Sequence, residues 1–253
     1  MTLLQHFKAA ILGAAVLLLS SCGDDAFPDY HYKMTVHIGD AQFSSVRALK
    51  QEQVSSIADS SGQTVKRLLE GQAVIIEFED GETVYALLGK PDEPEYAQKV
   101  AGYALLPLVP QFKRDPKTDD LAVERGTESL DRMADAQQAM VKIEGPQDLP
   151  RTRPNPFGFR DDQPTTLNSW PMFVTFRDPD DPKTVREVSP GSIGVDRITI
   201  EITDEDVTEG IKEKLTWITR MRGDLLNSAS VTRPNAALAG QIGTGDFFIG
   251  NSE

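Results

Sequence analysis

Histidine and cysteine, which often bind metals or act as nucleophiles, are scarce in this chain. It contains three histidines and one cysteine. His31 and His37 belong to an alternating segment, 29–39, that predicts a strand with its apolar side chains on one face. Six residues along a strand span roughly 20 Å, so the two histidines should lie on the opposite, solvent-facing side and cannot share one metal ion. We therefore expect no metal site and no cofactor.

Motifs of hydrolytic enzymes are not found, and the acidic segments predict turns and helix caps. The sequence has no G-x-S-x-G elbow and no S-x-x-K motif. An EF-hand loop counted from Asp178 would need glycine and glutamate where lysine and serine stand, and the prolines of 178–182 favour a turn. Thr203, Asp206 and Thr208 have the spacing of capping residues for a following helix. Two of the many carboxylates could still meet in space, so a hydrolase using Asp or Glu is an alternative.

The N-terminal segment has the features of an export signal. Lys8 precedes an unbroken apolar run, 9–19, which has the length of a signal-peptide core and is too short to span a bilayer. No later stretch of the sequence is a candidate membrane span. Cys22 follows shortly after this run, so it is either a lipid attachment point or a free cysteine behind an ordinary cleaved signal.

Leu19, Ser20, Ser21 and Cys22 resemble the lipobox of bacterial lipoproteins, a leucine and two small residues before a cysteine. The resemblance implies that Cys22 carries a diacylglyceryl group, that the chain is cut before it, and that the new amine accepts a further acyl chain such as palmitate. Two or more acyl chains hold a protein stably on a bilayer, whereas one does so only marginally. Gly23 stands where aspartate would favour the inner membrane, so the resemblance implies the outer membrane, facing the periplasm.

The composition is that of an acidic, folded protein. The 253 residues carry a formal net charge of -13 and 39% of them are hydrophobic. Nucleic acids and anionic lipid surfaces attract clustered Lys and Arg, so the acidic balance argues against both as main partners. A chain of this length can bury one large core or two small ones.

Several segments have the periodicity of strands. Asp80-Gly81 predicts a two-residue turn in a hairpin that pairs 74–78 with 84–88. Further strands are expected around 30–38, 64–71, 171–178 and 196–204. The late apolar patch 247–249 is either a docked edge strand or a frayed tail, and the glycines at 240, 243 and 245 favour a flexible tail.

Helical periodicity is found in three places. Helices are expected at 97–103, at 129–144 with Ser129 as N-cap, and from about Thr208, where Ile211, Leu215 and Ile218 recur at helical spacing. Trp170, Phe173, Phe176 and Trp217 are expected in the core. Strands outnumber helices and lack regular helical crossovers, which favours an α+β fold, mainly antiparallel β with two or three helices.

Three phrases of the sequence resemble a family of uncharacterised proteobacterial proteins that are often lipoproteins. The phrases are "GQAVIIEFEDGETVYALLG" (71–89), "PMFVTFRDPDDPKTVREVSP" (171–190) and "DRITIEITDEDVTEGIKEKLTWI" (196–218). The resemblance implies a setting in the Gram-negative envelope. It implies no catalytic residues and no mechanism.

The sequence thus predicts four regions and a role in the envelope. The regions are a lipoprotein signal peptide (1–21), the lipidated cysteine with a short tether (22–29), an α+β globular domain (30–222) and a Gly-rich, partly flexible C-terminal tail (223–253). We expect a membrane-anchored binding or assembly module rather than an enzyme. The expected partners of this module are the bilayer, through Cys22, and other envelope proteins. An envelope hydrolase using Asp or Glu and a small-ligand carrier are the alternatives.

Overall fold

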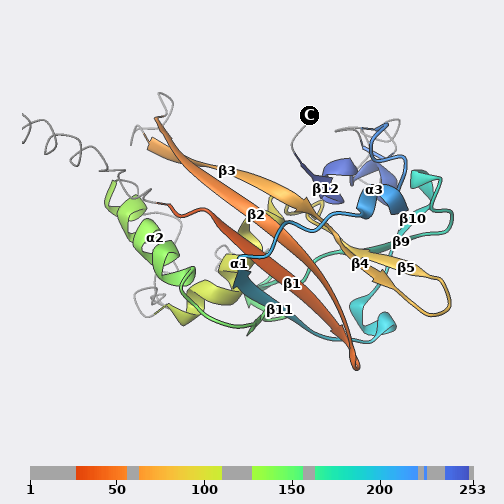
Figure 1. Cartoon of the computed structure of the whole chain (residues 1–253), viewed down its shortest axis with the longest axis horizontal. Coiled ribbons are helices and arrows are strands. Elements are labelled where there is room, and N and C mark those ends of the chain that lie inside the picture. The colour runs from red at the N-terminus through yellow and green to blue at the C-terminus, as the bar shows by residue number, and fades with distance from the viewer. Residues whose placement is uncertain are drawn as a thin grey trace, which may run out of the picture.

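A computed structural model describes the protein at residues 27–55, 63–109, 127–155, 163–221, 225–226 and 237–250. Within these residues the chain forms two antiparallel sheets, a two-stranded ribbon and three α-helices (Figure 1). The expected α+β fold with mainly antiparallel strands is confirmed. None of the helices in the described part of the chain is long and apolar enough to cross a membrane.

The larger sheet has six strands and joins distant parts of the sequence. In spatial order they are β12 (Phe248–Ile249), β3 (Gln63–Gln72), β2 (Ala41–Ser55), β1 (Tyr30–Ile38), β11 (Val195–Thr203) and β6 (Gln147–Asp148). The alternation expected for β1 is confirmed, since Tyr32, Met34 and Val36 are fully buried on its inner face. The central strand β1 pairs with β2, which follows it directly, and with β11, which follows more than 150 residues later.

The smaller sheet has four strands and contains the expected hairpin. Its order is β10 (Val185–Glu187), β9 (Phe173–Phe176), β5 (Thr83–Ala86) and β4 (Val74–Glu77). The turn between β4 and β5 is one residue longer than predicted. Phe78 N donates to Glu82 O (2.9 Å), and Gly81, at φ +87°, donates to Phe78 O (3.0 Å). A turn followed by a left-handed glycine makes a three-residue loop, 79–81, and not the two-residue Asp80-Gly81 turn.

The described chain has three α-helices, α1 (Tyr96–Leu105), α2 (Thr127–Met140) and α3 (Ile211–Lys214). Of these, α1 packs into the core between the two sheets. Ser129 lies inside α2 and is not its N-cap. The long helix predicted from Thr208 is wrong, because α3 ends after one turn, where Leu215 leaves the helical region. Ile211, Leu215 and Ile218 are nevertheless buried. The spacing of these apolar residues therefore predicted correctly which side chains are buried, but not how long the helix is.

The smaller sheet is buried on both faces. One face packs with α1 against the inner face of the larger sheet, and this shared core contains Val84, Ala86 and Phe173. The other face, with Tyr85, Val174 and Phe176, packs against α3 and residues 237–250. The expected core positions of Trp170, Phe173, Phe176 and Trp217 are confirmed.

Residues 237–250 form part of the fold. They contain two short 3₁₀ turns, Leu238–Gly240 and Thr244–Asp246, followed by β12, which pairs with β3. Phe247 is fully buried among Tyr85, Phe176 and Trp217. Of the two alternatives for 247–249, the structure has the docked edge strand.

Residues 204–210 form a strap across the outer face of the larger sheet (Figure 1). Thr208 N donates to Val46 O (3.1 Å), and Val46 N donates to the Thr208 hydroxyl (2.8 Å). Over β1, Glu205 accepts from the His31 ring at its carbonyl and pairs with Lys33 at its carboxylate. The prediction that Thr208 caps the following helix is wrong, because its hydroxyl accepts a hydrogen bond from the main chain of β2 instead.

Candidate functional site

Cys22, the one residue predicted as a functional site, lies outside the described residues. The described chain starts five positions later at Phe27, whose side chain is only 2% exposed. Pro28 O accepts from the Gln51 amide (2.8 Å), and the Asp29 carboxylate accepts from Gln51 N (2.7 Å). The folded domain is therefore fixed to its packing partners almost directly after the predicted attachment point.

The two histidines of β1 occupy different environments. His31 is half-buried under the strap. His37 is 9% exposed, and its Nε2 lies 3.1 Å from the Thr199 hydroxyl, so the prediction of a solvent-facing His37 is wrong. Burial and the nearby Arg197 guanidinium lower the pKa of His37. The described residues contain no group of three or more His, Cys, Asp or Glu side chains that could hold a metal ion.

The acidic segment 178–182 forms the predicted turn. The Asp178 carboxylate accepts from Asp180 N (3.0 Å), and the Asp181 carboxylate accepts from Lys183 N (3.0 Å). The Thr184 hydroxyl donates to the main-chain oxygens of this turn. Two of its three aspartates are thus engaged in closing the loop.

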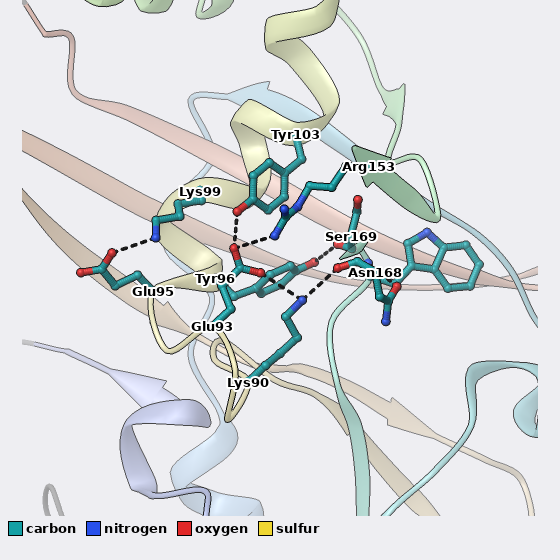
Figure 2. Close-up of polar contacts among 10 residues, drawn as sticks. Lys90, Glu93, Glu95, Tyr96, Lys99, Tyr103, Arg153, Asn168 and Ser169 are labelled. Atoms are coloured by element: carbon teal, nitrogen blue, oxygen red, sulfur yellow. Dashed lines mark hydrogen bonds and ion pairs between the residues drawn. The ribbon is translucent and has the colours of Figure 1, made fainter. Parts of the chain in front are cut away.

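A charged cluster at the start of α1 is the most unusual polar feature of the described chain (Figure 2). Glu93 lies between two cations, Lys90 at 3.0 Å and Arg153 at 2.9 Å, and also accepts from the Tyr103 hydroxyl. The side chains of Lys90, Glu93 and Arg153 are only 7%, 13% and 17% exposed. We call Lys90, Glu93, Tyr103 and Arg153 the Glu93 cluster.

The cations of the Glu93 cluster are also held by aromatic rings and by the main chain. Lys90 Nζ lies 4.6 Å from the centre of the Tyr96 ring and donates to Asn168 O (3.1 Å). Arg153 lies 4.2 Å from the centre of the Tyr103 ring. Cations over aromatic faces are stabilised by the ring quadrupole, more strongly where water is excluded. The cluster therefore ties the 90–95 turn to α1 and to the ribbon of β7 (Thr152–Pro154) and β8 (Thr166–Asn168).

The electrostatics of the Glu93 cluster favour an ionised Glu93. Burial alone would raise its pKa, but hydrogen bonds from Tyr103 and Lys90 and the charges of Lys90 and Arg153 outweigh burial and lower it. The pKa of Tyr103 is raised, first by burial and then by Glu93. A general acid needs a proton near neutral pH, so an ionised carboxylate held by three donors is poorly suited to that task.

Sequence reasoning missed the Glu93 cluster because its members are far apart in the chain. Lys90 and Glu93 are three positions apart, whereas Arg153 follows Glu93 by 60. The prolines of the "KPDEPE" stretch, 90–95, are typical of a turn, but nothing in the stretch identifies an arginine as the partner of Glu93.

The chain was compared with family models, curated proteins and solved structures. No match was found in any of the three comparisons. The resemblance to uncharacterised lipoproteins therefore stays a prediction.

Arg47 places a positive charge inside the core. Its side chain is completely buried on the inner face of β2, where Nε donates to Gln72 O (3.2 Å) and the guanidinium lies 5.8 Å from the centre of the Tyr32 ring. Nη1 and Nη2 have no hydrogen-bond partner among the described residues. The neighbouring Gly71, at φ +148°, leaves room for the arginine stem, since a Cβ there would lie 2.8 Å from Arg47 Cγ.

Arg47→Met is expected to leave the free energy of unfolding unchanged or to raise it by about 1 kcal/mol, because a poorly compensated buried charge is costly and methionine keeps the stem. Urea denaturation of the purified domain measures the difference. Arg47→Ala is the control and should be destabilised by about 2 kcal/mol or more, because it leaves a void. A clear loss of stability in Arg47→Met would show that the guanidinium is balanced by a group not recognised in this structure.

Proposed function

We propose that this protein is a lipid-anchored protein of the Gram-negative envelope, held by acyl chains on Cys22. Its domain would work as a binding or assembly module that faces the periplasm, with the outer membrane favoured over the inner membrane. The proposal assigns no catalytic activity to the domain.

The observation that carries the proposal is the short connection between Cys22 and the folded domain. Five peptide units separate Cys22 from the buried Phe27, and they span at most about 18 Å when fully extended. A domain on so short a connection stays beside the bilayer, where a module that recruits or braces other envelope components would act.

The geometry of the Glu93 cluster argues against Glu93 as the catalytic acid of a carboxylate hydrolase. Retaining and inverting glycosidases need two carboxyl groups with different proton affinities on either side of a substrate. Glu93 is instead surrounded by cations and a tyrosine, and its lowered pKa keeps it ionised. The residues that contact Glu93 connect α1 to the β7–β8 ribbon, which is a structural role.

Cys22→Ala tests the anchor. The full chain is expressed in a Gram-negative host, labelled with radioactive palmitate and separated into membrane and soluble fractions. We expect the variant to lose the label and to leave the washed membranes after detergent-free extraction. Retention of both label and membrane binding in Cys22→Ala would contradict the proposed anchor.

Two further variants serve as controls for this experiment. Ser21→Ala keeps a small residue before the cysteine and should be acylated like the parent chain. Gly23→Asp places aspartate where the lipobox resemblance associates it with retention, so the protein should move from outer-membrane to inner-membrane fractions on a sucrose gradient. An unchanged distribution in Gly23→Asp would contradict the membrane assignment but not the anchor.

A further inference from the structure

The tether joins the domain at one end of the larger sheet. Phe27 to Asp29 pack beside Gln51 in the second half of β2, and the Gln51 amide also donates to Gln137 of α2 (2.8 Å). In Figure 1 the start of β1, the far ends of β2 and β3, and α2 lie together at this end. We call it the tether end.

The opposite end of the larger sheet is farther from the attachment point at Phe27 than the full length of the tether. Strand β1 runs nine residues from the tether end to the turn at Gly39–Asp40, a length of about 27 Å at the usual rise per residue. The connection from Cys22 to Phe27 reaches at most about 18 Å. Turns 78–82 and 178–181 also lie away from the tether end (Figure 1).

Charge is distributed unequally between the two ends. The turns 39–40, 78–82 and 178–181 contain seven aspartates and glutamates, which outnumber the cations beside them: Arg177 and Lys183 flank the last turn, and Arg186 pairs with Glu82 (3.1 Å). The exposed residues around the tether end mix both signs, as Lys50, Glu52, Lys66, Asp131 and Arg132 show. An anionic leaflet repels the acidic turns and is indifferent to the mixed surface, so the charges favour the same orientation as the tether.

We propose that the tether end, formed by α2 and the adjoining parts of β2 and β3, rests against the lipid headgroups and that the acidic turns point away from the bilayer. This inference rests on the proposed lipid anchor. It assigns the bilayer as the partner of the tether end and leaves the acidic turns as the surface available to other envelope components.

The predicted acylation of the only cysteine makes a single-cysteine experiment possible. Lys66→Cys and Asp131→Cys place one exposed thiol at the tether end, and Asp40→Cys and Glu79→Cys place one at the acidic turns. Each lipidated protein is labelled with a thiol-reactive fluorophore. It is then bound to vesicles of phosphatidylethanolamine and phosphatidylglycerol that contain a lipid with a spin-labelled headgroup, which quenches only nearby fluorophores.

We expect quenching at Lys66→Cys and Asp131→Cys to exceed that at Asp40→Cys and Glu79→Cys several-fold. The same four labels on a Cys22→Ala background serve as the control and should not be quenched. Proteins that float with the vesicles but show equal or reversed quenching would overturn the orientation alone. Proteins that lack the acyl mass and do not float would overturn the anchor and the orientation with it.

Discussion

Glu93→Gln is expected to lower the free energy of unfolding by about 3 kcal/mol, because it leaves two largely buried cations facing a neutral amide. Lys90 and Arg153 would lose their shared counter-charge while staying under the Tyr96 and Tyr103 rings. Removing one partner of a buried ion pair costs more than the pair contributes, since the remaining charge is left unbalanced. Urea denaturation followed by tryptophan fluorescence measures the loss.

Glu95→Gln is the matched control for this prediction. Glu95 pairs with Lys99 at 3.0 Å, four positions along the chain, but its side chain is 61% exposed (Figure 2). Exposed pairs of this kind contribute about 0.5 kcal/mol or less. If the two variants lost the same stability, the Glu93 cluster would not be the structural connection between α1 and the β7–β8 ribbon that we describe.

The stability difference between the parent protein and Glu93→Gln is expected to depend on pH. The pKa of Glu93 is lowered from its ordinary value of 4.5 in the folded state. A carboxylate with a lowered folded pKa stabilises the fold above its unfolded pKa, and the stabilisation is lost as pH falls through the folded pKa. The two stability curves should therefore converge in acid and separate at neutral pH. Parallel curves over this range would contradict the assignment.

Phe247→Ala is expected to destabilise the domain by about 4 kcal/mol, the usual cost of emptying a fully buried phenylalanine site. The ring is completely buried and lies within 6 Å of the rings of Tyr85, Phe176 and Trp217. Its main-chain oxygen also accepts from Ala73 N (2.8 Å). Thermal and urea denaturation of the purified variant check the value.

Phe248→Ala is the neighbouring control, because the Phe248 side chain is only half-buried and packs at the margin of the same apolar cluster. Lys212 Nζ lies 4.3 Å from the centre of its ring, so some loss is expected, but clearly less than for Phe247→Ala. A Phe247→Ala variant as stable as the parent would show that, in solution, residues 237–250 do not pack against the face of the smaller sheet that contains Tyr85 and Phe176.

Local patterns in the sequence predicted β1, β3, β4, β5, β9 and β11, but they missed β2, which at 15 residues is the longest strand of the described chain. The alternation in 30–38 reflects side chains that face a core on every second position, whereas the apolar run at 173–176 belongs to a strand that is buried on both faces. Lengths and ends were less predictable. The Asp80-Gly81 pair signalled a turn but not its size, and the helical spacing after Thr208 continued past the single turn of α3.

Contacts between distant segments could not be predicted from one sequence. Arg153 meets Glu93 only because the β7–β8 ribbon packs beside α1, and Thr208 meets Val46 only because the strap crosses the sheet. The glycines around 240–245 suggested flexibility, yet Ala239 and Ile242 between and beside them are buried. The lipobox prediction at Cys22 is of the opposite kind, since it depends only on adjacent residues and stays a prediction whatever the fold.

The central position of β1 in the larger sheet determines the order in which the strands of that sheet can pair during folding. One edge of β1 is matched at once by β2, but the other pairs with β11, which is synthesised only after more than 150 further residues. A nascent chain would therefore present nine residues of open strand edge, a template for pairing with other chains, until β11 is synthesised. Pairings over such long sequence separations also form slowly. The open edge of β1 is therefore the part of the fold that stays exposed to mispairing until residues 195–203 are available.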